Sequence, residues 1–295
     1  MAKRIFLFVV TNILVVLVIS IVLTFLGVGR YVGPRGLNIG SLMVFCLVWG
    51  MVGAFISLAL SRWMAKHAMG VRLVDGHTGH DELDWLYRTV ERLTQQAQLP
   101  MPEVGFYDSP EVNAFATGPS RNRSLVAVSS GLLRSMRREE AEGVLAHEVT
   151  HIVNGDMVTM ALLQGVINAF VMFLARIIAY AISSRGNSRD DRNGQMNYLV
   201  VWVLQIVFGI LGSLVTAWFS RQREFRADRG GAQLAGRDRM IAALKRLAAN
   251  HELVDTQHAE LAAFKINGMP GWTSLFSTHP PLEARIAALE RITPR

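Results

Sequence analysis

The sequence is poor in the residues and motifs that mark disulfide-stabilised and nucleotide-dependent proteins. It has a single cysteine, Cys46, so no disulfide can form within the chain. That cysteine lies in an apolar run, which is compatible with a catalytic part in a reducing compartment. The chain also has no Gly-rich phosphate loop, so we expect no nucleotide partner and no unfolding work driven by ATP hydrolysis in this protein.

Charge is scarce as well. Charged residues make up 18% of the 295 residues and hydrophobic residues 51%, which is typical of a membrane protein rather than of two soluble domains. A net charge of +7 could indicate nucleic-acid binding, but the basic residues are scattered and form no block interleaved with aromatic residues. Many of them flank apolar runs. We therefore expect anionic lipid headgroups as their partners, and no nucleic acid.

Four long apolar runs account for this composition, and each is long enough as a helix to cross a bilayer. Only the third contains a charged residue, Arg176, which could reach the far interface with its long side chain. The first run is too long for a signal-peptide core and lacks a good cleavage site, so we take it as an uncleaved anchor. The runs cover residues 5–26, 39–60, 157–182 and 198–219.

These runs divide the chain into membrane and soluble parts. We expect two transmembrane helices in residues 1–66, and two further transmembrane or membrane-embedded helices in residues 157–219. The soluble parts, residues 67–156 and 220–295, would form the two halves of one domain. The predicted fold is therefore that of a mainly α membrane protein with four hydrophobic helices and one soluble domain.

The soluble parts have both helical and strand-like patterns. A helical stripe covers residues 81–98, and helical spacing recurs in residues 240–249 and 281–292. Short β-like pieces, separated by turn residues, cover residues 103–107, 112–117 and 124–129. We expect an α+β domain with a small antiparallel sheet. One edge strand could pair with an extended peptide, or the sheet could be purely structural.

The most specific motif is His147-Glu148-Val149-Thr150-His151, in a setting that should be helical. Residues four apart lie on one face of a helix, so His147 and His151 can bind one metal ion. Glu148 lies beside that face, where it can hold a metal-bound water and take its proton. The alternative is two unrelated histidines on a helix.

A catalytic zinc site with two histidines needs a third protein ligand, often a carboxylate. Glu224 and Asp228 lie one helical turn apart later in the chain. Glu224 could bind the metal, while Asp228 accepts a hydrogen bond from the far nitrogen of a ligating histidine. Alternatively, both carboxylates only pair with the neighbouring arginines on a solvated helix.

This ligand set constrains the topology. If His147, His151 and Glu224 bind one ion, the chain between them crosses the membrane an even number of times, or forms an apolar hairpin that does not fully span. The basic residues at the ends of the runs, including Lys3, Arg4, Arg62 and Lys66, favour the catalytic side slightly. By the positive-inside rule we expect that side to face the cytoplasm.

Four motifs together resemble, in sequence order, the HtpX family of membrane-embedded zinc metalloproteases. The resemblance covers nearly the whole chain. The motifs are Asn113-Ala114-Phe115-Ala116-Thr117-Gly118, His147-Glu148-x-x-His151, Glu224-x-x-Ala227-Asp228 and His279-Pro280. The resemblance implies a gluzincin-type zinc metallopeptidase, distantly related to the CAAX prenyl protease, with one Zn²⁺ per chain bound by two histidines and one glutamate.

The resemblance also implies a function and a location. It implies a multi-pass protein of the bacterial inner (plasma) membrane, which cleaves misfolded or flexible membrane proteins in quality control and the stress response. Asn113 would lie near the substrate, and the His279-Pro280 element would close the site, where we expect His279 to stabilise the oxyanion. Without the resemblance, Asn113 could form an Asx turn and His279 could be a structural loop residue.

Two other functions stay open from the sequence. A membrane scaffold or chaperone could retain zinc for folding without proteolysis, although a structural site usually has four protein ligands and only His279 could supply the fourth. Processing of prenylated CAAX peptides is the second, but relatives with that activity have more membrane spans than we find here.

Overall fold

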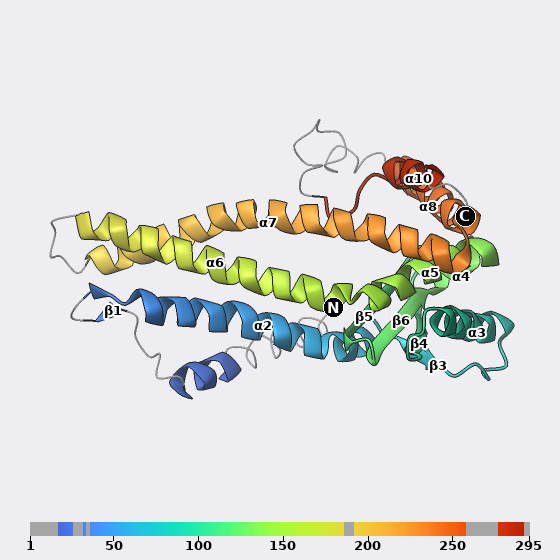
Figure 1. Cartoon of the computed structure of the whole chain (residues 1–295), viewed down its shortest axis with the longest axis horizontal. Coiled ribbons are helices and arrows are strands. Elements are labelled where there is room, and N and C mark those ends of the chain that lie inside the picture. The colour runs from blue at the N-terminus through green and yellow to red at the C-terminus, as the bar shows by residue number, and fades with distance from the viewer. Residues whose placement is uncertain (1–16, 26–31, 34–35, 186–191, 258–276, 292–295) are drawn as a thin grey trace. The chain divides into compact units, whose positions relative to one another are not determined.

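The computed structural model describes residues 17–25, 32–33, 36–185, 192–257 and 277–291 (Figure 1). The chain divides into two compact units. The first unit contains residues 1–57 and 160–216, and the second contains residues 58–159 and 217–295. Three long helices contribute residues to both units, and each unit is described separately below.

The long helices are α2 (Ile39–Ala68), α6 (Asp156–Arg185) and α7 (Arg192–Ala235). Each contains a segment long and apolar enough to cross a membrane, so the described residues hold three candidate membrane helices. They correspond to the second, third and fourth apolar runs. Of the first run, residues 5–26, only residues 17–25 are described, and these are helical. A fourth membrane helix therefore remains a prediction.

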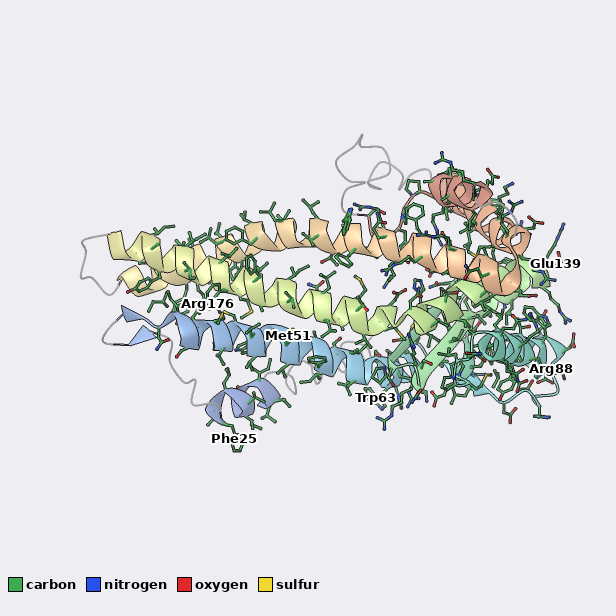
Figure 2. The ribbon with its side chains drawn as sticks, viewed as in Figure 1. Phe25, Met51, Trp63, Arg88, Glu139 and Arg176 are labelled. Atoms are coloured by element: carbon green, nitrogen blue, oxygen red, sulfur yellow. The ribbon has the colours of Figure 1, made fainter. Side chains whose placement is uncertain are left out.

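Small residues let two helices of the first unit approach closely. A Cβ atom added to Gly50 on α2 would lie 2.4 Å from the Gly165 carbonyl oxygen and 2.7 Å from the Ala169 nitrogen, both on α6. Nearby on α6 is Arg176, which Figure 2 labels. Its guanidinium lies 5.4 Å from the centre of the Phe45 ring of α2 and donates to a backbone carbonyl of its own helix. The charge in the third apolar run is thus placed against an aromatic face and a carbonyl.

The second unit contains a four-stranded mixed sheet with the order β3-β4-β6-β5. Its strands are β3 (Arg72–Val74), β4 (Glu103–Tyr107), β5 (Ala114–Ser120) and β6 (Arg123–Ser129). The prediction of an antiparallel sheet was wrong, because β4 and β6 pair in parallel. After β4 the chain moves to the far edge of the sheet to form β5, and it then returns as β6, which lies between β4 and β5. Strand β6 therefore runs in the same direction as β4.

Helices α3 (Asp81–Gln96) and α5 (Arg138–Asn154) share one hydrophobic core with this sheet. The core contains Leu86, Val90 and Leu93 of α3, Leu145, Val149 and Ile152 of α5, and Val104, Val126 and Val128 of the strands. Ala114 and Ala116 of the edge strand β5 pack against the same cluster. This packing places α5 beside the edge of the sheet.

Helix α5 is also fixed near its first turns and at its end. The buried Glu142 carboxylate accepts hydrogen bonds from Arg92 of α3 at 2.6 Å and from Arg239 of α8 (Arg237–Gln257) at 2.8 Å. At the other end, Gly155 has the left-handed conformation, with φ 68° and ψ 30°, which caps α5 and is favourable for glycine. The next residue, Asp156, already begins α6, so a single residue separates the two helices.

The C-terminal helix α10 (Leu282–Glu290) packs against α8 (Figure 1). Their contact is apolar and includes Met240 and Leu244 of α8 and Leu289 of α10. This contact fixes the position of α10, and of the residues just before it, against the rest of the second unit.

Candidate metal centre

The helix that carries the His-Glu-x-x-His motif is buried almost all round. Every residue from Ala141 to Ile152 is buried except Glu148, which is partly exposed. Both imidazoles therefore point into the protein, whereas the carboxylate between them in sequence remains accessible to water. This arrangement would suit a general base beside two buried metal ligands.

Glu224 of α7 meets both imidazoles, and the three side chains form a group that could hold a metal ion. The two Nε2 atoms of His147 and His151 lie 3.1 Å apart. Glu224 Oε2 lies 3.5 Å from His147 Nε2, and its Oε1 lies 3.5 Å from His151 Nε2. Two ligands bound tetrahedrally to zinc, each at about 2.1 Å, are separated by about 3.4 Å. The residues present thus fit a zinc-sized ion.

Each imidazole has a carboxylate partner on its other nitrogen. His147 Nδ1 lies 3.0 Å from Asp228 Oδ1, and His151 Nδ1 donates to Asp156 Oδ2 at 2.7 Å. With the proton held on Nδ1, Nε2 of each ring keeps a free lone pair for a metal. Asp228 was proposed from the sequence for such a contact, whereas Asp156 was not predicted.

The carboxylates also make the site favourable for positive charge. Burial alone lowers the pKa of the His151 imidazole, but its hydrogen bonds to Asp156 and Glu224 outweigh burial and raise that pKa to about 9. Burial also lowers the pKa of the His147 imidazole, but its interactions with Asp228 and Glu224 raise that pKa above its ordinary value. An environment that stabilises a proton on these rings also suits a metal cation.

Two adjacent glycines let α7 approach α5 at this point. A Cβ atom added to Gly230 would lie 2.3 Å from Thr150 Cγ2, and one added to Gly231 would lie 3.2 Å from the His147 nitrogen. Both contacts are shorter than ordinary van der Waals distances. The close approach brings the turn with Glu224 and Asp228 to the histidines.

We expect Gly230→Ala to weaken the metal centre and to destabilise the second unit by about 1–3 kcal/mol, as overpacking does. Thr150 is buried and its hydroxyl donates to the Ala146 carbonyl at 2.7 Å, so its methyl group cannot turn away freely. Gly209→Ala, on the same helix with open space around the added methyl, is the control and should be neutral or slightly stabilising. Thermal melting and metal affinity of both variants test this. Equal behaviour of the two variants would contradict it.

The structure places the other two predicted site residues differently. His279 is 64% exposed, and its Nδ1 lies 3.0 Å from Glu224 Oε2, so it contacts a candidate ligand directly. Asn113 is exposed and immediately precedes the edge strand β5, where its backbone exchanges hydrogen bonds with Ser129. Among the described residues, no hydrogen bond links the Asn113 side chain to the metal group.

Arg285 and Asp156 belong to the site but were missed in the sequence. Arg285 contacts Asp228, Glu224 and His147 from α10. The sequence does indicate that Arg285 is unusual, because it is a charged residue on an otherwise apolar helical face that includes Leu282 and Leu289. Asp156 has a weaker signal, as an acidic residue at the very start of an apolar run.

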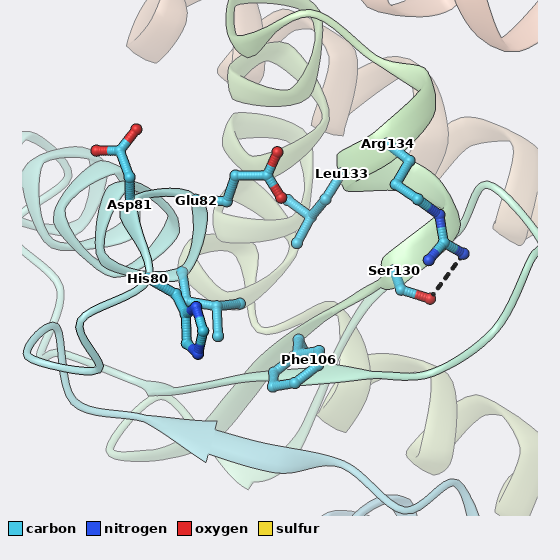
Figure 3. A pocket seen from close by; sticks show the side chains of 8 residues that line it. His80, Asp81, Glu82, Phe106, Ser130, Leu133 and Arg134 are labelled. Carbon is cyan, nitrogen blue, oxygen red and sulfur yellow. Dashed lines mark hydrogen bonds between the residues drawn. The ribbon is translucent and has the colours of Figure 1, made fainter.

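A separate pocket of about 490 Å³ lies between the start of α3, strand β4 and helix α4 (Ser130–Ser135). Figure 3 shows Phe106 and Leu133 among its lining residues, with the Arg134 guanidinium donating to the Ser130 hydroxyl at 3.2 Å. None of the residues that line it belongs to the metal group. It is therefore not part of the candidate centre.

Comparisons with known proteins agree with the site. The sequence signature of Peptidase family M48 matches residues 81–293. "Protease HtpX homolog" of Thiobacillus denitrificans is 51% identical over 98% of this chain and 99% of its own length. "Protease HtpX" of Aeromonas hydrophila is 53% identical over 97% of this chain and 99% of its own length. The crystal structure of S. mikatae Ste24p matches with a TM-score of 0.63 at 17% identity, over 98% of this chain and 67% of that chain, which shows a common fold.

A buried His-Glu-x-x-His helix joined by a carboxylate from a second helix is typical of a metallopeptidase, and the three candidate membrane helices among the described residues indicate one of the membrane. The chain belongs to Peptidase family M48, and within it to the HtpX proteases. It is thus a membrane metalloprotease and acts on polypeptides. The alternative of a non-proteolytic scaffold is not favoured.

Proposed function

We propose that this protease binds one Zn²⁺ per chain through His147, His151 and Glu224, and that Glu148 is its general base. One observation carries the proposal: Glu224 meets both Nε2 atoms while Glu148 alone on this stretch of α5 is open to solvent. Two imidazoles and one carboxylate are a ligand set that suits zinc in hydrolases and leaves a position for water. Affinity alone would not select zinc over other divalent metals. The choice of zinc is supported instead by the ligand types and by the family.

When bound, zinc would polarise both a water molecule and the scissile carbonyl group. The protein's own groups then move the protons. Glu148 takes a proton from the attacking water and later delivers it to the leaving amine. Asp228 and Asp156 keep the two imidazoles in the tautomer that offers Nε2, as their contacts with Nδ1 support.

The edge strand β5 is the proposed binding place for the substrate backbone. Among the described residues β6 is its one partner in the sheet, so its other side could pair with an extended peptide. Asn113 is exposed at the start of this strand, where its amide can bind a substrate carbonyl or amide group. His279 would stabilise the oxyanion, and because its Nδ1 faces Glu224, donation to the oxyanion would come from Nε2.

We further propose that the substrates are misfolded or flexible membrane proteins, removed in quality control and the stress response. The chain has no ATPase motif, so its substrates must already be locally unfolded. Its metal ligands lie close in sequence to apolar helices: α6 follows the motif helix after Gly155, and α7 itself carries Glu224. The four apolar runs and their basic flanks support a multi-pass protein of the bacterial inner membrane with its catalytic part in the cytoplasm.

Metal analysis combined with a cleavage assay tests this proposal. We expect purified protein to carry about one zinc ion per chain, as a single three-ligand site implies, and a chelator to abolish cleavage of a membrane substrate. Added Zn²⁺ should restore cleavage, because the site is assembled from residues that are already packed.

A scaffold would behave differently in the same experiment. Chelation would then unfold the protein, and the intact protein would cleave nothing. Thermal melting with and without the chelator, measured alongside cleavage, separates the two outcomes.

A further inference from the structure

Helix α10 places an arginine side chain inside the second unit. Arg285 is 6% exposed, although it lies on a helix of only moderate length near the end of the chain. A buried arginine is rare in proteins and normally needs paired negative charge to offset the loss of its hydration. Its partners therefore indicate why it is there.

The partner is Asp228. Arg285 Nε donates to Asp228 Oδ2 at 2.7 Å and Arg285 Nη2 donates to Asp228 Oδ1 at 2.6 Å, a bidentate pair in which both carboxylate oxygens are engaged. The same Oδ1 lies 3.0 Å from His147 Nδ1. A continuous chain of contacts thus runs from α10 through α7 to an imidazole of α5.

The guanidinium also lies close to the metal group itself. Arg285 Nη1 is 3.5 Å from Glu224 Oε2, and Nη2 is 3.4 Å from His147 Nδ1. It is therefore the cation that faces the buried carboxylates Glu224 and Asp228 from the side of α10. Both carboxylates are 1% exposed, so water does little to screen them.

We propose that Arg285 is a positioning residue of the metal centre: its guanidinium fixes the Asp228 carboxylate in the orientation that holds His147 ready to bind the metal. The inference rests on the proposed function, since it assigns the role through a ligand of that site. Arg285 touches neither substrate nor metal in this role and acts through Asp228.

Arginine suits this role better than lysine. Its planar fork matches the two carboxylate oxygens and fixes the carboxylate plane, whereas an ammonium group is a point charge that leaves the plane free to rotate. Without the fork, His147 is the remaining contact of the Asp228 carboxylate among the residues that the structure describes. Its carboxylate could then turn away from the imidazole, and the ring would lose its orientation.

The test measures metal binding, so it does not depend on catalysis. Full-length wild type, Arg285→Gln, Arg285→Lys, Asp228→Asn and the Arg285→Gln/Asp228→Asn double variant are purified in detergent. Arg291→Gln is the control, because Arg291 follows the same helix and is exposed. Zn²⁺ affinity is measured by competition with a chelator, and the visible absorption of Co²⁺-loaded protein reports the ligand geometry.

We expect Arg285→Gln to bind Zn²⁺ about 10–100-fold more weakly than wild type, the usual effect of losing a partner behind a ligand. Arg285→Lys should fall between the two, and Arg291→Gln should match wild type. The double variant should bind Zn²⁺ as tightly as the single variant with the lower affinity, because both changes break the same chain of contacts. The Co²⁺ spectrum should shift in every variant that changes Arg285 or Asp228 and should stay unchanged in Arg291→Gln, which a purely structural contact between α10 and α7 would not cause.

Zinc affinity of Arg285→Gln within twofold of wild type would overturn the inference. So would losses in the two single variants that multiply in the double variant, since Arg285 would then act independently of Asp228. If Arg285→Gln does not fold, the zinc affinity of Arg285→Lys takes its place in the test, and a value within twofold of wild type would overturn the inference. Failure of the wild type to bind Zn²⁺ would instead contradict the proposed function, which separates the two cases.

Discussion

Glu148→Gln should leave the metal on the protein and stop proteolysis. The proposed ligand atoms belong to His147, His151 and Glu224, so the substitution removes none of them. Glutamine keeps the shape of the side chain but cannot take a proton from water. General acid–base catalysis contributes typically about 10²–10⁴-fold, and Glu148 serves as base and then as acid in the proposed mechanism. We expect kcat to fall by at least about 10³-fold.

Glu139→Gln provides a matched control for this experiment. Glu139 lies in the first turn of the same helix and is exposed (Figure 2), so its loss should leave both metal content and cleavage unchanged. The measurement is the rate of cleavage of a membrane substrate that wild type degrades, together with the zinc content of each variant. Undiminished cleavage by Glu148→Gln would refute the assigned role, whereas loss of zinc would show that the substitution disturbs the ligands.

The parts of the site that depend on local spacing could be predicted from the sequence. His147 and His151 share a helix face because they are four residues apart, and the same spacing pairs Glu224 with Asp228. Asp156 depends on a turn: Gly155 in the left-handed conformation ends α5 and turns the chain so that Asp156 meets His151. Arg285 depends on the packing of α10 against α8. Neither contact follows a helical period, so the four-residue spacing that relates the other site residues does not pair Asp156 with His151 or Arg285 with Asp228.

The fold shows the same division between local and long-range information. The strand at residues 103–107 has the predicted bounds, because alternation of side chains is a local property. Its pairing was not predicted, since order in a sheet depends on long-range contacts. One signal was available in β6: Leu125, Val126, Ala127 and Val128 are consecutive apolar residues, all buried, as in a strand covered on both faces at the centre of a sheet.

The fourth apolar run shows why helix ends are harder to predict than helices. The run ends at residue 219, but α7 continues to Ala235. Its last turns lose the apolar pattern because they face α5 with Glu224, Asp228 and two glycines rather than lipid or a hydrophobic core. Hydropathy marks only the apolar part of a helix. A helix that continues into a polar site therefore extends beyond its hydrophobic segment.

Glu224→Gln should have the largest effect on metal binding of any single change on α7. The carboxylate is 1% exposed, and its two oxygens lie 3.5 Å from His147 Nε2 and from His151 Nε2 respectively. An uncharged amide oxygen is a poor zinc ligand, and the substitution also removes the negative charge nearest to the cation. We expect Zn²⁺ affinity to fall by more than about 100-fold, beyond the about 10–100-fold loss expected for a residue behind a ligand.

Three variants, ranked by zinc affinity, test the division of roles between the two carboxylates of α7. Glu283→Gln, an exposed glutamate of α10, should bind Zn²⁺ as wild type does. Asp228→Asn should bind more weakly, because His147 loses its partner on Nδ1, and Glu224→Gln should bind most weakly of all. If Glu224→Gln retained zinc as tightly as Asp228→Asn, Glu224 would not be the third ligand. The metal would then have to be bound without the carboxylate that the packing of α7 against α5 brings to both imidazoles.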